Sequence, residues 1–102
     1  MYINAQHELI EHMKGKEILC ADITYSESYG SDTKIQLRVG YTTEELTIFL
    51  SKLCFQYDNS YGRQYIYGKV WYKDGSWSGR GEYDGSEWWN DNTTPEIPEG
   101  LR

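Results

Sequence analysis

The chain contains 102 residues with 10 basic and 16 acidic side chains, which gives a formal net charge of −6. A chain of this length fits one domain around one core, so we expect a single domain over residues 1–102. The excess of carboxylates argues against direct binding to nucleic acid or to anionic membrane surfaces, because both require clustered Lys and Arg. It leaves open a basic protein partner.

The two cysteines, Cys20 and Cys54, are too few for a disulfide framework. Both lie among apolar neighbours, which predicts that they are reduced core residues. The N-terminal segment has no signal-peptide pattern, and no apolar run approaches the roughly 20 residues of a membrane span. These features predict a cytoplasmic protein that does not act on membranes.

The first forty residues read as one helix followed by two strands. Asn4 is a good N-cap residue and Gly15 a stop signal, so we expect a helix between them. A largely apolar strand is predicted over 16–25 and a polar loop over 26–33. Strict alternation of apolar and polar residues predicts a half-buried strand over 35–41, paired with the first as an antiparallel hairpin.

The strongest local signal is a capping box formed by Thr42 and, three residues later, Glu45. In this motif each of the two side chains accepts a hydrogen bond from the backbone of the other residue. The apolar residues that follow recur at helical spacing: Leu46, Phe49, Leu50 and Leu53. The pattern predicts a second helix with one face against the core.

Strand signals dominate from Cys54 onward. We expect strands over 55–57, 65–72 and 77–83, a turn over 58–62, and tight turns at 74–75 and 84–85. From about residue 90 the chain is polar and contains two prolines, which predicts an extended tail over 90–102.

The resulting element order is α-β-β-α-β-β-β. This order predicts an α+β domain in which two helices pack on one face of an antiparallel sheet. On the long strand 65–72, Ile66, Val70 and Tyr72 mark the face that we expect the helices to cover.

Catalytic and metal-binding patterns are absent from the sequence. His7 and His12 are five residues apart on one helix, so they do not share a face as a metal pair would. Glu82 and Asp84 have side chains about 7 Å apart on one strand, which permits acid–base catalysis, but the polar outer face of a hairpin gives the same pattern. We therefore expect a protein that is not an enzyme and has no cofactor or metal.

Aromatic and acidic residues concentrate in the last half of the chain. Eleven of the sixteen aromatic residues lie between Phe55 and Trp89. Residues 81–102 hold six carboxylates (Glu82, Asp84, Glu87, Asp91, Glu96 and Glu99) against Arg102 alone. Sheet packing and an ordinary solvated tail explain both features without a function. The alternative is an interface, because Tyr and Trp dominate binding hot spots.

The run 81–89 (GEYDGSEWW), followed by PEIP at 95–98, resembles the C-terminal end of small uncharacterised proteins encoded by bacteriophages and prophages. The resemblance covers roughly residues 54–101. In size, acidity and lack of catalytic motifs the chain is also similar to phage anti-defence proteins, including anti-CRISPR inhibitors. These resemblances imply a protein that acts in the cytoplasm of a bacterial host cell.

The resulting hypothesis is a phage-type inhibitor that binds a host nucleic-acid-handling or defence complex, such as a CRISPR effector. The partner would be a basic, nucleic-acid-binding protein, and this chain would not contact nucleic acid itself. The expected partner-binding residues are Trp77, Glu82, Tyr83, Asp84, Glu87, Trp88, Trp89 and Asp91. Two alternatives remain open: a sugar- or peptide-binding module that uses exposed Trp and Tyr, and a small structural or assembly protein. The oligomeric state stays open.

Overall fold

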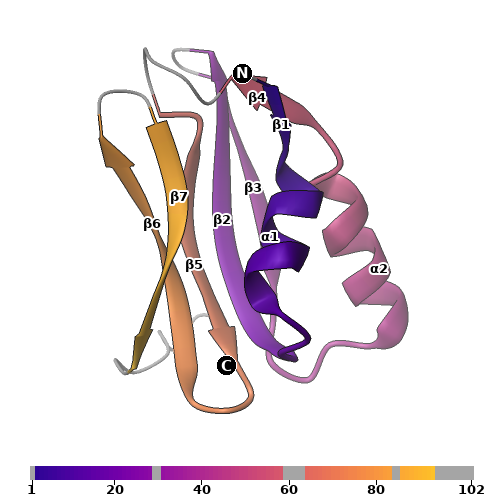
Figure 1. The fold of residues 1–102 in the computed structure, drawn as a ribbon. Coiled ribbons are helices and arrows are strands. Elements are labelled where there is room, and N and C mark those ends of the chain that lie inside the picture. Colours follow the sequence, from indigo (N-terminus) through magenta and orange to yellow (C-terminus); the bar gives the residue numbers. More distant parts are fainter. Residues whose placement is uncertain (1, 29–30, 59–63, 84–85, 94–102) are drawn as a thin grey trace.

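A five-stranded antiparallel sheet with two helices on one face forms the body of the protein in its computed structural model (Figure 1). The structure describes residues 2–28, 31–58, 64–83 and 86–93. The elements, in chain order, are β1 (Tyr2–Asn4), α1 (Ala5–Met13), β2 (Ile18–Ser28), β3 (Ser31–Leu37), α2 (Thr43–Lys52), β4 (Gln56–Asp58), β5 (Ile66–Tyr72), β6 (Ser76–Tyr83) and β7 (Ser86–Thr93). The α+β fold expected from the sequence is confirmed.

The strands of the large sheet lie in the order β3-β2-β5-β6-β7, and every neighbouring pair is antiparallel. Strand β2 therefore pairs with β3, as the sequence predicts, and on its other side with β5. The short strands β1 and β4 form a separate two-stranded sheet, because Ile3 lies opposite Tyr57. Strand β1 is not expected from the sequence, because three residues that end at an N-cap give no periodic signal.

Both predicted helix starts are confirmed. The side chain of Asn4 accepts a hydrogen bond from the backbone N–H of His7 at 3.0 Å, and α1 ends in left-handed Lys14 and Gly15. At the start of α2, the Thr42 hydroxyl accepts from the N–H of Glu45 at 3.1 Å, and the Glu45 carboxylate accepts from the N–H of Thr42 at 3.0 Å. This is the complete capping box.

The core lies between the helices and one face of the sheet. Ile66, Val70 and Tyr72 of β5 are almost fully buried there, as predicted. They meet apolar residues from both helices and from the neighbouring strands: Leu9, Phe49, Leu53, Ala21, Ile23, Ile35, Leu37, Tyr57 and Trp89. Burial of these side chains supplies most of the driving force for folding.

A close approach between β2 and β5 requires glycine at position 68. Gly68 has a φ of +133°, and a Cβ added to it would lie 2.2 Å from the carbonyl oxygen of Asp22. Neither this backbone angle nor this space suits any other residue. The glycine therefore permits the two central strands of the sheet to pair at this point.

Three boundaries predicted from the sequence are wrong. The stretch 26–33 is not a loop, because β2 runs to Ser28 and β3 begins at Ser31; β3 in turn ends at Leu37 instead of residue 41. Residues 90–93 are part of β7 and not of a tail. Polar residues continue these strands because ladder pairing needs only backbone groups. The predicted turns 58–62 and 84–85 and the tail beyond residue 93 lie mainly outside the described residues.

The two cysteines differ in environment. Cys20 is fully buried, as predicted, and burial raises the pKa of its thiol to about 11. Cys54 is exposed, so its assignment to the core is wrong. It follows the last turn of α2, where its apolar neighbour Leu53 faces the core instead. Among the described residues, neither helix has the length and apolar character needed to cross a membrane.

The capping box gives a first prediction. Replacing Thr42 with Ala removes the acceptor for the N–H of Glu45, so we expect a loss of about 1 kcal/mol in the free energy of unfolding. Urea denaturation followed by circular dichroism measures this loss. The matched control is Thr47→Ala in the middle of the same helix, which we expect to be neutral or slightly stabilising. Equal losses in both variants would show that the cap is not the cause.

Candidate functional site

The β6–β7 hairpin carries the residues that the sequence singled out, and strand alternation divides them between two faces. Ser78 and Arg80 point toward the helices, since Arg80 contacts Glu8 of α1. The opposite face carries no helix, and we call it the helix-free face. It holds Trp77, Gly79, Gly81 and Tyr83 of β6 and, in register with them, Ser86, Trp88, Asn90 and Asn92 of β7.

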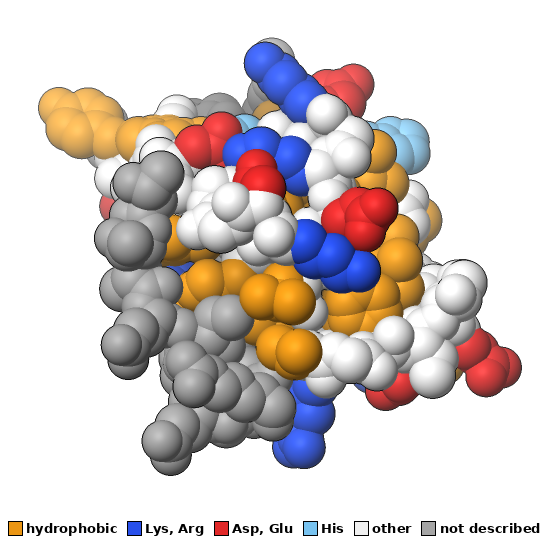
Figure 2. All heavy atoms as spheres, turned by 90° about the horizontal axis from the view of Figure 1, so that it is seen from below, with side chains coloured by type: hydrophobic (Ala, Val, Ile, Leu, Met, Phe, Trp, Pro, Cys, Tyr) orange, Lys and Arg blue, Asp and Glu red, His pale blue; other side chains and the backbone are white. Residues whose placement is uncertain are grey.

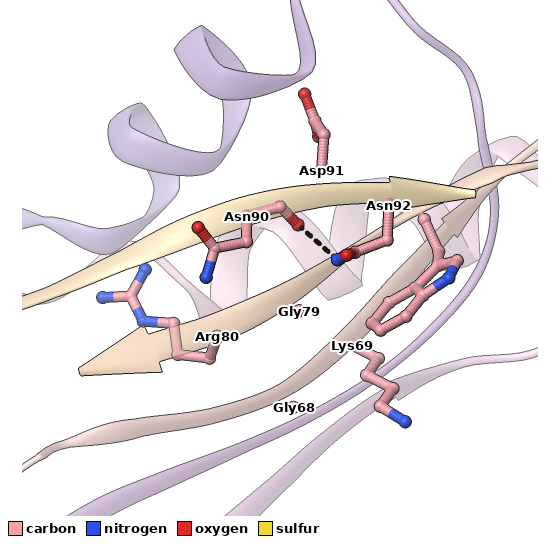
Figure 3. Close-up of a pocket in the computed structure, with 8 residues that line it drawn as sticks. Gly68, Lys69, Gly79, Arg80, Asn90, Asp91 and Asn92 are labelled. Carbon is pink, nitrogen blue, oxygen red and sulfur yellow. Dashed lines mark hydrogen bonds between the residues drawn. The ribbon is translucent and has the colours of Figure 1, made fainter. Parts of the chain in front are cut away.

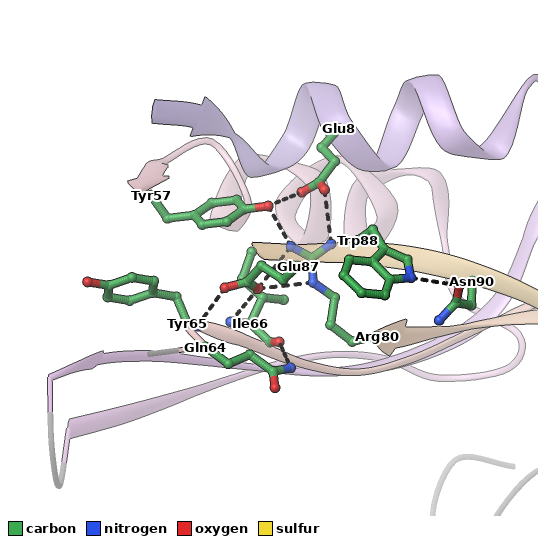
Figure 4. Close-up of polar contacts among 9 residues, drawn as sticks. All are labelled: Glu8, Tyr57, Gln64, Tyr65, Ile66, Arg80, Glu87, Trp88 and Asn90. Carbon is green, nitrogen blue, oxygen red and sulfur yellow. Dashed lines mark hydrogen bonds and ion pairs between the residues drawn. The ribbon is translucent and has the colours of Figure 1, made fainter. Parts of the chain in front are cut away.

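A buried arginine occupies the helix-facing side of the hairpin (Figure 4). The guanidinium of Arg80 lies 2.9 Å from Glu87 Oε1 and 3.2 Å from Glu8 Oε2, and it donates a hydrogen bond to the Tyr57 hydroxyl. Only 1% of the Arg80 side chain is exposed, and 0% of the Glu87 side chain. We call Glu8, Tyr57, Arg80 and Glu87 the arginine cluster. It joins α1, β4, β6 and β7.

The Glu87 carboxylate also fixes the start of β5. It accepts hydrogen bonds from the backbone N–H groups of Tyr65 and Ile66 at 2.8 and 3.1 Å, and from Arg80 Nε at 3.1 Å (Figure 4). A buried carboxylate is tolerated when a cation and several donors satisfy it together. Glu87 is therefore a structural residue of the core.

The cluster fixes the charge states of Arg80 and Tyr57. Burial lowers the pKa of Arg80, but the Glu8 carboxylate foremost, with Tyr57 and Glu87, raises it by more, so the guanidinium stays charged. Burial and the hydrogen bond to Glu8 raise the pKa of Tyr57, so the phenol stays neutral. The guanidinium also lies 5.0 Å from the centre of the Trp89 ring, a cation–π distance.

A second polar chain ties α1 to the edge strand β7. Asp91 Oδ1 lies 2.7 Å from His12 Nε2, and it accepts a hydrogen bond from the Ser78 hydroxyl at 2.8 Å. Ser78 is fully buried and also bonds the Tyr72 hydroxyl at 2.7 Å. The aspartate stands between the serine and the histidine, so the histidine cannot activate the serine as a nucleophile. The arrangement is structural.

The helix-free face carries two tryptophans that lie on glycines. A Cβ added to Gly79 would be 2.8 Å from Cζ3 of Trp77, and one added to Gly81 would be 2.8 Å from Nε1 of Trp88. The indole rings therefore rest directly on the backbone of β6. The Trp88 N–H donates to Asn90 Oδ1 at 2.8 Å, which fixes the orientation of that ring.

A shallow open hollow of about 580 Å³ lies on this face beside Trp77 (Figure 3). Its lining is Gly68, Lys69, Trp77, Gly79, Arg80, Asn90, Asp91 and Asn92. Figure 3 shows Asp91 pointing away from the side of β7 that carries Asn90 and Asn92. The side chains that face the hollow are thus an indole, two amides and one ammonium group.

The end of the sheet at which β5 and β6 meet shows a mixed surface (Figure 2). Hydrophobic side chains lie there among separate Lys or Arg and Asp or Glu side chains. Charges of both signs are interspersed. The described residues at this end therefore present no extended field of one sign to a partner.

The structure separates the eight partner-binding residues predicted from the sequence. Glu82, Tyr83 and Trp88 are exposed near the turn of the hairpin, and Trp77 is partly buried further along the same strand. Asp91 is exposed but lies on the helix-facing side against His12. Asp84 lies outside the described residues.

Two of the eight residues are buried and do not reach the surface. With backbone and side chain counted together, Glu87 and Trp89 are 2% and 7% exposed. The sequence contained a signal for this arrangement. Asp84 and Gly85 form a two-residue hairpin signal in the sequence, and such a turn predicts the register that β6 and β7 have, with Glu82 opposite Glu87 and Arg80 diagonal to Glu87. Two facing carboxylates repel each other unless a cation lies nearby.

No group of three or more His, Cys, Asp or Glu side chains in the described ranges is arranged to hold a metal ion. No family model, no curated protein and no solved structure matches the chain.

The arginine cluster gives a second prediction. Replacing Arg80 with Met leaves the carboxylates of Glu87 and Glu8 without their cation, so we expect a loss of about 3–5 kcal/mol in the free energy of unfolding. The matched control is Lys69→Met, an exposed cation on the adjacent strand, with an expected change within about 0.5 kcal/mol. Urea denaturation compares them. Similar losses in the two variants would contradict the role of the cluster.

The Asp91 interactions give a third prediction, on pH. Hydrogen bonding from Ser78, and then His12, holds the pKa of Asp91 below its ordinary value. A lowered native pKa stabilises the fold at neutral pH, and this stabilisation is lost as the pH falls through that pKa. Asp91→Asn should therefore lower the free energy of unfolding at neutral pH and have no effect in acid.

Because 54% of the Asp91 side chain is exposed, we expect a difference below about 1 kcal/mol at neutral pH. Denaturant unfolding of both proteins over an acid-to-neutral series measures it. A difference between the two proteins that stays constant across the series would contradict the role of the charge.

Proposed function

We propose that the protein is a non-catalytic binding protein that holds a protein partner through the turn end of the β6–β7 hairpin. We call the exposed residues Glu82, Tyr83, Ser86 and Trp88 the hairpin tip. Its biological role, in this proposal, is that of a phage-type inhibitor that acts in the bacterial cytoplasm on a basic, nucleic-acid-handling host protein.

The observation that carries the proposal is the exposure of Tyr83 and Trp88. These side chains are 78% and 38% exposed on a strand pair whose other side is packed. They are diagonal cross-strand neighbours, because Tyr83 lies opposite Ser86 and Trp88 is two residues further on. Two adjacent aromatic residues of this kind form a typical hot spot.

The support beneath the tip favours rigid docking. Arg80 and Glu87 anchor the two strands of the hairpin directly behind the tip. The Trp88 ring is fixed by Gly81 and Asn90, so it loses little freedom when a partner covers it. Preorganised side chains bind more tightly because less conformational entropy is lost.

Charge favours a basic partner. The whole chain has a net charge of −6, and the exposed Glu82 adds a carboxylate at the end of β6, next to Tyr83 in the sequence but on the other side of the strand. Carboxylates at the edge of an interface steer a basic partner and make association depend on salt. The proposal needs no catalytic group, in keeping with the expectation that the protein is not an enzyme.

The fourth prediction tests the tip. A partner captured from a bacterial lysate by the wild-type protein is purified, and its affinity is measured for wild type, Tyr83→Ala and Tyr67→Ala. Tyr67 is the matched control, because it is 44% exposed but lies on β5, outside the tip. We expect Tyr83→Ala to weaken binding at least about tenfold and Tyr67→Ala to leave it unchanged.

The same measurements at higher salt should show weaker binding of the wild-type protein. Thermal melts establish that each variant is folded. Unchanged affinity of folded Tyr83→Ala, or a loss as large in Tyr67→Ala, would exclude the hairpin tip as the binding site.

A further inference from the structure

We propose that the hollow beside Trp77 is a saccharide-binding subsite that takes a neutral β-1,4-linked oligosaccharide. The hollow lies toward the other end of β6 and β7 from the hairpin tip, where Trp77 pairs with Asn92. This inference goes beyond the proposed protein partner, because it concerns a different ligand held at Trp77; of the hairpin tip, only Trp88 borders both surfaces.

The Trp77 ring is held in one position on the backbone of β6. The ring packs on Gly79, whose added Cβ would meet Cζ3 at 2.8 Å and Cη2 at 3.6 Å. An indole seated on backbone in this way cannot turn edge-on into the sheet. The Lys69 ammonium lies over the ring, 5.0 Å from its centre. When this flexible side chain moves aside, the apolar C–H face of a sugar ring can pack against the indole.

Two indole rings follow one another along β6. Trp88 rests on Gly81 as Trp77 rests on Gly79. Two residues on one strand are about 7 Å apart, so the two indoles follow one another along β6. A β-1,4-linked chain is extended and flat, which lets consecutive sugar rings contact successive aromatic surfaces. A helical α-linked chain curves away from such a row.

The polar groups around the Trp77 ring suit the hydroxyl groups of a sugar. Asn90 uses its Oδ1 for Trp88, and Asn92 uses its Nδ2 for the carbonyl of Asn90 at 3.2 Å. This leaves the Asn90 amide nitrogen as a donor and Asn92 Oδ1 as an acceptor within the described part of the chain. Amide groups that can both donate and accept suit hydroxyl groups.

The charge around the hollow favours a neutral ligand. Lys69 is the one charged side chain that faces the hollow among the described residues, because Arg80 and Asp91 are engaged on the helix-facing side. The Lys69 Nζ lies 5.0 Å from the centre of the Trp77 ring. A single flexible ammonium donates readily to a hydroxyl oxygen. It repels a basic peptide, and phosphate chains require several cations.

The dimensions of the hollow also suit a saccharide chain. The size of the hollow, about 580 Å³, falls within the range of small-ligand sites, and its openness along β6 and β7 leaves room for a chain.

The fifth prediction tests the subsite. The protein is titrated with cellohexaose and chitohexaose, and with maltohexaose as the α-linked control, by calorimetry and by tryptophan fluorescence. We expect saturable binding of at least one β-1,4-linked hexasaccharide with a shift of the emission maximum, and no binding of maltohexaose. No binding of either β-1,4-linked compound would overturn the proposal.

Variants separate the subsite from the hairpin tip. Trp77→Ala should weaken saccharide binding at least about tenfold. Because this change also affects packing around Cys20 and Trp71, Asn92→Ala serves as a second variant with an exposed side chain. We expect Asn92→Ala to weaken binding several-fold without changing the melting temperature. Saccharide binding that survives both changes would exclude the hollow.

Tyr83→Ala is the matched control, since this residue belongs to the tip and not to the hollow. It should bind the hexasaccharide as wild type does while losing the protein partner. Asn92→Ala should show the reverse pattern. Failure of the saccharide titration therefore leaves the protein-binding proposal standing, and failure of the partner measurement leaves the subsite standing.

Discussion

The buried ion pair between Arg80 and Glu87 is the interaction on which the rest of the structure depends. A charged arginine inside a small domain is tolerable only when carboxylates and a hydroxyl surround it. Here Glu8 comes from α1 and Tyr57 from β4, so the pair is satisfied only when four elements are in place together. The cluster therefore favours one arrangement of the helix, the short sheet and the hairpin.

Placing these charges inside determines what remains on the outside of the hairpin. The helix-facing side uses Glu87, Trp89 and Asp91 for packing and for the contact with α1. The helix-free face retains aromatic rings seated on glycines, where larger residues would push the rings off the strand. The acidic and the aromatic features of this segment, adjacent in sequence, thus belong largely to opposite faces.

The helix-free face is divided in turn by its local chemistry. At the tip, a strongly exposed tyrosine lies diagonally beside Trp88, a combination suited to a protein surface, and the neighbouring Glu82 carboxylate belongs to the opposite side of the hairpin, in register with Glu87. Near Trp77 the side chains are amides and one ammonium, with backbone as the floor. One sheet face can hold both because glycine lets the backbone itself form part of a binding surface.

The sequence by itself determined the fold class, both helix starts, the pairing of β2 with β3 and the buried face of β5, since capping and periodicity are local properties. It could not assign faces along 81–93, where polar and aromatic residues alternate without a clear apolar side. Whether Glu87 faced solvent depended on Arg80, and whether Arg80 faced inward depended on Glu8, distant in sequence. Only the tertiary structure, by bringing these residues together, decided which carboxylates are core and which aromatic residues are exposed.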